Sequence, residues 1–235
     1  MNQNDYWKGI DFVDYDYDSI PRFAKSLPNI FDYHIDINKN AYLNWRMDFA
    51  GKRRLRFAIF GEAYFDTAYY LLTQCLEDNS DKKADVWIFP ILFNTIHGIE
   101  VYLKAIHSSY NISLNTGTGN IEGNHDIRQL CSTAKNQILN FRKLHPDSCS
   151  DQLFEAIKVV ENFIEHIYAN SEDMTFARYP MQKNKEDQFY VFPHGNIVVN
   201  LEKLNQQLPI IYHMLDFILE MSEMYIENME IADYS

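Results

Sequence analysis

Apolar residues recur at intervals of three and four along several long stretches of this chain, the spacing that puts side chains on one face of an α-helix. The stretches with this spacing are 52–77, 84–108, one that starts near Asn124 and ends before 145, 151–169 and 200–228. Pro90 is expected to be tolerated early in its helix or to kink it, and Pro209 is expected to kink its helix or to mark its true start. The pattern predicts a mainly α protein, an antiparallel bundle of about five helices.

Two stretches depart from the helical pattern. Residues 1–50 are aromatic and acidic, and we expect an irregular extension there, with a hairpin over 34–47 that turns at Asn38-Lys39-Asn40. Residues 188–199 contain FYVF and NIVV around Pro193-His194-Gly195, which predict a small β-hairpin. The expected organisation is therefore an extension, 1–50, followed by a helical domain, 51–235.

Composition supports a large buried core. Of the 235 residues, 46% are hydrophobic, and there are 16 Tyr and 16 Phe. The low content of glycine and proline, 8 and 7 residues, argues against a loop-rich β protein. The net charge of −12 excludes a broad basic surface for duplex nucleic acid, and leaves the segment 51–56, GKRRLR, as the strongest local basic patch.

Cysteine use and hydropathy indicate the compartment. Cys75, Cys131 and Cys149 form no CxxC pair, so neither a disulfide framework nor a zinc ribbon is indicated. The first residues contain no apolar leader, and no window of 18 apolar residues is free of charge. We expect a cytoplasmic protein with no membrane contact.

The predicted helix 84–108 carries four ionisable side chains on one face. They stand at i, i+3, i+7 and i+10, with Asn94 on the same stripe: His97, Glu100, Lys104 and His107. The Glu100–Lys104 pair has the favourable order for an i,i+4 contact and would contribute ~0.3–0.5 kcal/mol if exposed. Such a stripe suits either a salt-bridge network within the bundle or a functional cleft, and the pattern leaves both open.

A second motif, GNHDIRQL at 123–130, opens the next predicted helix. Asn124 and Asp126 are favourable capping residues. His125 is a poor cap, and its charged form is disfavoured at a helix N-terminus, so a neutral imidazole that acts as a base is expected there.

The two motifs together suit RNA cleavage without a metal. That reaction needs a base for the 2′-hydroxyl proton, an acid for the leaving oxygen and a cation for the phosphorane charge. Imidazoles titrate near neutral pH and suit the first two tasks, which points to His97 and His125. Lys104, Arg128 or Arg178 would supply the cation. An ion pair between Arg178 and a carboxylate is the structural alternative.

Other chemistries are not indicated. His97 and Glu100 have the spacing of a helical metal pair, but no second copy appears, so we expect no metal. No Walker-type phosphate loop and no nucleophile elbow occurs, and no cofactor is expected.

The order of the motifs resembles a known family. The pattern H-x-x-E-x-x-L-K at 97–104, then H-D-I-x-x-L at 125–130, then F-x-R-Y-P at 176–180 is similar to prokaryotic HEPN-like proteins, in which RHAIELxLKxL is followed by G-HDL-x-x-L. The resemblance covers about residues 55–225. It implies an antiparallel helical bundle, often dimeric. Many members are metal-independent endoribonucleases of toxin–antitoxin or antiphage systems, and others are non-catalytic nucleotide-binding or structural partners.

One family motif is missing. Nuclease members carry Arg, four to six residues and then His on a late helix, whereas here Arg178 to His194 is too long and Arg142 to His145 too short. A catalytic set would therefore be His97, Lys104 and His125. The binding or orienting residues would be Asn94, Glu100, His107, Asp126, Arg128 and Arg178.

We expect a HEPN-like defence or stress-response protein that acts as a metal-independent endoribonuclease through His97, His125 and Lys104. The alternative is a non-catalytic module that binds a nucleotide or a protein. The expected partners are a second copy of the chain, RNA or a nucleotide, and an antitoxin or another defence protein.

Overall fold

The computed structural model describes residues 29–43, 52–117, 123–146, 149–169, 171, 174–182, 184–190 and 197–233. The chain divides into two units, Met1–Trp45 and Arg46–Ser235. In the first unit, residues 29–43 contain a short 3-10 helix, Ile37–Lys39, which Asp36 caps by accepting a hydrogen bond from the Asn38 amide. No strand occurs among 34–43, and the rest of the hairpin expected at 34–47 lies outside the described residues.

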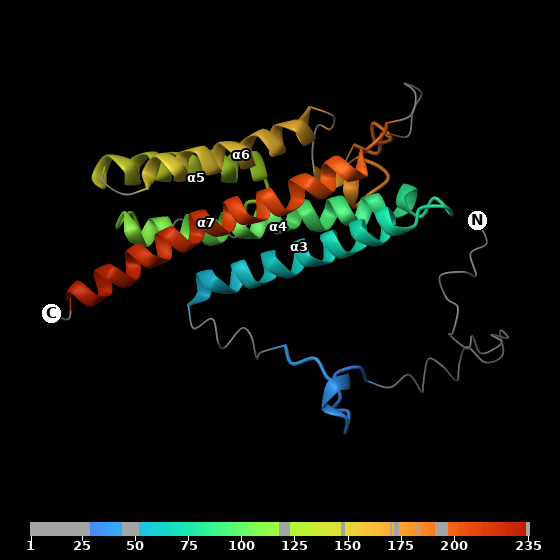
Figure 1. The fold of residues 1–235 in the computed structure, drawn as a ribbon, viewed down its shortest axis with the longest axis horizontal. Helices are drawn as coiled ribbons and strands as arrows, with labels where there is room; N and C mark the ends of the chain where they lie inside the picture. Colours follow the sequence, from blue (N-terminus) through green and yellow to red (C-terminus); the bar gives the residue numbers. More distant parts are fainter. Residues whose placement is uncertain are drawn as a thin grey trace. The chain divides into compact units, whose positions relative to one another are not determined.

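The second unit is a bundle of helices, which confirms the mainly α prediction (Figure 1). The described helices are α3 Arg53–Glu77, α4 Ala84–Ser113, α5 Ile127–Leu144, α6 Ser150–Tyr168 and α7 Leu201–Asp233. Helix α4 extends five residues beyond the predicted end at 108. Pro90 and Pro209 both lie inside their helices rather than at the first residue.

The predicted antiparallel arrangement holds for two pairs of helices, whereas α4, α5 and α7 depart from it. Contacts of Gly61 with Tyr102 and of Gly98 with Phe65 make α3 antiparallel to α4. Helix α6 is likewise antiparallel to α5, as the pairs of Arg128 with Glu165 and Arg142 with Asp151 require.

Helices α4, α5 and α7 run in the same direction. Glu100 meets His125 and His107 meets Gln137, so residue numbers rise together along α4 and α5. The contacts of Tyr102 with Asp216 and of Ser109 with Glu223 show the same relation between α4 and α7. Helix α5 therefore begins beside the middle of α4, where His125 contacts Glu100, rather than beside the end of α4 at Ser113.

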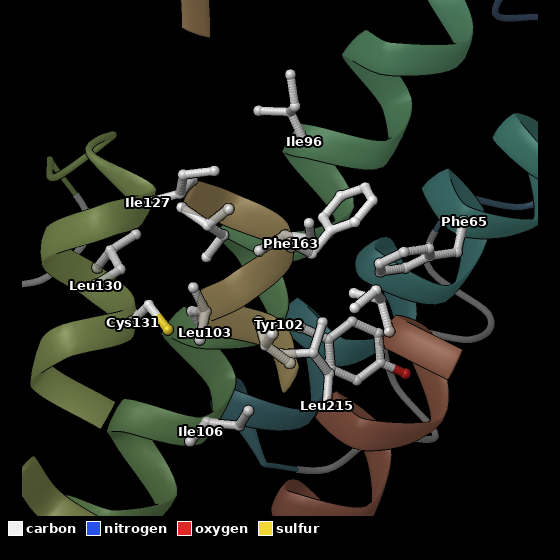
Figure 2. Close-up of a cluster of buried hydrophobic side chains, with 14 of the residues drawn as sticks. Phe65, Ile96, Tyr102, Leu103, Ile106, Ile127, Leu130, Cys131, Phe163 and Leu215 are labelled. Atoms are coloured by element: carbon white, nitrogen blue, oxygen red, sulfur yellow. The ribbon is translucent and has the colours of Figure 1, made fainter. Parts of the chain in front are cut away.

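Helix α4 is the centre of the bundle and packs against α3, α5 and α7. Leu103, Ile106 and Tyr102 from α4 lie between Leu130 of α5 and Leu215 of α7 (Figure 2). By length and composition α4 could also cross a bilayer, and half of its most apolar 18-residue segment is buried inside the bundle.

Close contact between α3 and α4 depends on two glycines. A Cβ atom on Gly61 would lie 2.3 Å from Cδ2 of Tyr102, and one on Gly98 would lie 3.0 Å from the Phe65 ring. Tyr102 and Phe65 are themselves almost fully buried. The bare glycine backbone therefore lets the two aromatic rings pack directly against the facing helix.

The β-hairpin predicted at 188–199 is wrong. Residues 188–190 and 197–199 are not strands, residues 191–196 lie outside the described part, and the nearest pairing is one isolated bridge between Met181 and Asp187. The aromatic residues pack singly instead: Phe189 contacts the Phe176 ring, and the Tyr190 hydroxyl donates to the Phe176 and Tyr179 carbonyls. Phe189 and Tyr190, from the FYVF run that suggested a strand, lie instead in a loop that these ring and hydroxyl contacts hold in place.

Candidate functional site

Three side chains converge on the carboxylate of Glu100. Lys104 Nζ lies 2.8 Å from Oε1, His125 Nδ1 lies 2.9 Å from the same oxygen, and His97 Nδ1 lies 3.3 Å from Oε2. We call these four residues the Glu100 cluster. Glu100 and Lys104 are buried, whereas the side chains of His97 and His125 are 29% and 69% exposed. A buried carboxylate thus holds two imidazoles at the surface.

The cluster keeps Glu100 ionised. Burial on its own would raise the pKa of this carboxyl group, but hydrogen bonds from His97, Lys104 and His125 and the positive charge of Lys104 outweigh burial. Together they lower the pKa of Glu100 to about 2. At neutral pH the group is therefore a carboxylate that accepts hydrogen bonds and cannot donate one.

This ionisation fixes the orientation of both imidazoles. Because the carboxylate only accepts, Nδ1 of His97 and of His125 must each carry the proton in these bonds. Each ring then has Nε2 left for chemistry, as an acceptor when the ring is neutral and as a donor when it is charged. Since both bonds end on one carboxylate, the two Nδ1 atoms lie at most about 8 Å apart, two hydrogen-bond lengths plus the carboxylate width.

Different parts of the fold supply the two histidines. His97 and Lys104 reach Glu100 because they stand three residues before it and four residues after it on α4. His125 reaches it because it lies directly before α5, whose start is level with Glu100 and where Asp126 caps the helix by accepting from the Gln129 backbone amide. The Asn124 side chain accepts from the Asp126 amide and fixes the turn next to His125.

Aromatic rings surround His97. The Phe93 ring is stacked on it at 5.7 Å, with planes only 10° apart, and the Tyr64 ring of α3 meets it edge-on at 4.6 Å. The Arg178 guanidinium lies 5.8 Å from the centre of the same Phe93 ring, and Arg178 is exposed. Arg178 and His97 therefore both lie beside the Phe93 ring.

Lys104 and Arg128, the other proposed cations, are each held by a carboxylate. Lys104 is 3% exposed and contacts Glu100. Its ammonium group therefore neutralises the buried Glu100 carboxylate and does not face solvent. Arg128 makes two hydrogen bonds of 2.6 Å to Glu165 on α6 and stacks on Tyr168 at 4.0 Å. Arg178 is thus the proposed cation that no carboxylate holds among the described residues.

His107 belongs to a separate network. Its Nδ1 donates to Gln137 Oε1 at 3.1 Å, and its Nε2 accepts from the Asn111 amide at 2.9 Å. Burial lowers the pKa of His107, and the bond to Gln137 opposes this only in part. The neutral imidazole links α4 to α5 and is not joined to the Glu100 cluster.

The remaining predicted residues have modest roles. Asp126 accepts a hydrogen bond from the Tyr168 hydroxyl at 3.3 Å in addition to capping α5. Asn94 is half-buried on α4, one residue after Phe93. The rings of Phe93 and Tyr64 are not among the predicted site residues. Phe93 could have been found, because it stands four residues before His97 on the same helix, but no local pattern places Tyr64 of α3 there.

A metal centre is not indicated by geometry. Within the described ranges, no group of three or more His, Cys, Asp or Glu side chains is arranged to hold a metal ion. The Glu100 oxygens are already engaged by Lys104 and the two imidazoles. The arrangement is suited instead to proton transfer or to hydrogen bonding by two oriented imidazoles.

Comparison with known proteins gives no match: no family model fits the sequence, and no curated protein or solved structure is significantly similar.

Proposed function

We propose that this chain is a HEPN-like, metal-independent endoribonuclease of the defence or stress-response type, with His97 and His125 as the acid–base pair. The observation that carries the proposal is the shared carboxylate: Glu100 orients both imidazoles through Nδ1 and leaves both Nε2 atoms for substrate. A carboxylate that orients an imidazole and stabilises its charged form is a common device in acid–base catalysis.

The proposed reaction is a transesterification. One imidazole, neutral, takes the proton of the 2′-hydroxyl through Nε2 as that oxygen attacks phosphorus. The other imidazole, charged, gives its Nε2 proton to the departing 5′-oxygen as the phosphorus–oxygen bond breaks. The products are a 2′,3′-cyclic phosphate and a 5′-hydroxyl, and the two imidazoles have exchanged protonation states. Glu100 stays ionised throughout, which its low pKa permits.

The charge on the phosphorane requires a cation. Lys104 is buried against Glu100, and Arg128 is paired with Glu165, so neither faces a bound phosphate. Arg178 is exposed beside Phe93 and is the candidate for this role. Lys104 would then act by neutralising Glu100, as a positioning residue rather than a catalytic one.

The test is incubation of the purified chain with single-stranded RNA in excess EDTA. We expect cleavage that leaves 2′,3′-cyclic phosphate or 3′-phosphate ends opposite 5′-hydroxyl ends, because no metal-bound water takes part. Cleavage that appears only with added Mg²⁺, or 3′-hydroxyl ends, would contradict the mechanism.

A second candidate is a non-catalytic HEPN-like module that binds a nucleotide or a protein partner such as an antitoxin. The engagement of Lys104 and Arg128 by carboxylates favours it, because it removes two of the three proposed phosphate-binding cations. RNA fragments that bind to the chain in EDTA without being cut, and lose affinity in Arg178→Ala, would support this candidate over the nuclease.

We further propose a homodimer in the cytoplasm. The support is exposed apolar surface on α3, where Phe60 and Leu76 are 49% and 37% exposed, because homodimer interfaces are rich in apolar and aromatic residues. Light scattering after size exclusion at micromolar concentration should give twice the chain mass of 27.8 kDa. A monomer at that concentration would remove the dimer, and with it any site shared between two copies.

A further inference from the structure

A pocket lies between α3 and α7, apart from the Glu100 cluster. Its volume is about 260 Å³, and it is lined from α3 by Phe65, Asp66 and Tyr69 and from α7 by Leu208, Pro209 and Tyr212. None of these six residues belongs to the Glu100 cluster. The pocket is therefore a separate feature of the bundle.

The inner wall of this α3–α7 pocket is aromatic and fixed. The rings of Phe65 and Tyr212 are 5.7 Å apart, and both pack against Tyr102 of α4, at 6.2 Å and 5.9 Å. Tyr102 is 2% exposed and its hydroxyl donates to Asp216, so the ring behind the pocket cannot turn away. Tyr69, 44% exposed, stands at the rim.

The charge around this aromatic wall is negative. Burial raises the pKa of Tyr212, and the carboxylates of Asp216, Glu62 and Asp66 raise it further, although a hydrogen bond with Tyr102 opposes them. In the part of the chain that the structure describes, no ion pair joins Glu62, Asp66 or Asp216 to a cationic side chain. Among the described residues, the negative charge beside the pocket therefore has no cationic partner.

We propose that the α3–α7 pocket binds a small organic cation, an ammonium ion whose nitrogen carries alkyl groups. Aromatic faces attract such cations through the ring quadrupole, and alkyl groups fill an apolar pocket that a strongly hydrated metal ion would leave empty. A neutral apolar ligand would gain nothing from Asp66, and an anion would be repelled by it and by the net charge of −12. The aromatic rings and the Asp66 carboxylate together therefore favour a ligand that is both positively charged and alkylated.

The probe is choline, compared with 3,3-dimethylbutan-1-ol, in which carbon replaces the charged nitrogen at nearly the same shape. Both are titrated into the full chain and followed by calorimetry or by chemical shifts. We expect saturable binding of choline, at least tenfold weaker binding of the alcohol, and weakening of choline binding by added salt.

Two variants at exposed positions test the pocket. Asp66→Asn removes the lining charge and Tyr69→Leu removes the rim ring, and both side chains are exposed enough for the fold to persist. Each variant should weaken choline binding about three- to thirtyfold, the range for loss of a cation–π contact. The matched controls are Glu220→Gln on α7 and Tyr70→Leu beside Tyr69, neither of which lines the pocket, and both should leave affinity unchanged.

Three results would overturn the proposal. They are choline binding that does not saturate, equal affinity for choline and the alcohol, and equal losses in Tyr70→Leu and Tyr69→Leu. Because the assay contains no RNA and the variants leave the Glu100 cluster intact, its outcome is independent of the nuclease proposal.

Discussion

Substitution of both imidazoles, in His97→Ala/His125→Ala, is expected to abolish RNA cleavage, and His125→Ala alone should reduce the rate by about 10²- to 10⁴-fold. The reason is that each ring contributes one proton transfer through Nε2, while Glu100 orients both rings. Initial rates on one RNA substrate, in EDTA, give the measurement.

A matched control is available on α7. His213 is exposed, and its ring lies beside Tyr212, away from the Glu100 cluster. His213→Ala should cleave RNA at the wild-type rate. Activity that survives in the His97/His125 double variant would assign cleavage to other groups or to a contaminant. Equal loss in His213→Ala would show that the assay reports stability rather than chemistry.

Glu100→Gln is expected to lower the free energy of unfolding at pH 7 by ~3–5 kcal/mol, the usual cost of breaking a buried ion pair from one side. The substitution keeps the shape of the side chain but leaves the Lys104 ammonium, 3% exposed, without its counter-charge. The expected loss is far larger than the ~0.3–0.5 kcal/mol that the Glu100–Lys104 pair would contribute if it were exposed on the helix surface. Urea unfolding of both proteins measures the difference.

The difference between Glu100→Gln and wild type should depend on pH. The carboxyl pKa is about 2 in the folded protein and near 4.5 when unfolded, so the unfolded state binds the proton first as pH falls. The stabilisation from Glu100 is therefore complete above about pH 5 and is lost towards pH 2.

His107 also makes the fold less stable in acid, but at a pH above the range in which Glu100 acts. Burial lowers the pKa of His107 in the folded protein, so the unfolded state binds the proton first and is favoured once the pH falls below the unfolded pKa.

A surface pair provides the control for Glu100. Glu161 on α6 pairs with Lys135 on α5, with side chains 33% and 28% exposed. Glu161→Gln should cost at most about 1 kcal/mol. The double variant Glu100→Gln/Lys104→Met should recover much of the loss, because it removes the buried charge. Equal losses in the Glu161 and Glu100 variants, or no recovery in the double variant, would contradict the assigned burial cost.

Part of the Glu100 cluster could be predicted from sequence because it is local. The spacing of three and four residues on one helix already places His97 and Lys104 beside Glu100. The burial of Lys104 could not be predicted, because it depends on how α3, α5 and α7 surround α4. The same limit applies to Arg128, whose partner Glu165 comes from the facing helix α6.

The arrival of His125 at Glu100 depends on the path of the chain. An antiparallel arrangement of α4 and α5, which short connections usually produce, would place the start of α5 near the end of α4 at Ser113. The observed parallel arrangement brings it back to the middle of α4. The predicted hairpin at 188–199 failed for a related reason, since Phe189 and Tyr190 are anchored by contacts with remote residues rather than by a neighbouring strand.

The parallel course of α4 and α5 also means that no single helix contains the complete site. Glu100 lies on α4 and His125 lies directly before α5, so their hydrogen bond forms only when the two helices pack together. Without this packing the Glu100 carboxylate would lack one of its donors and would have a higher proton affinity. The state of the site therefore reports whether α5 is docked on α4.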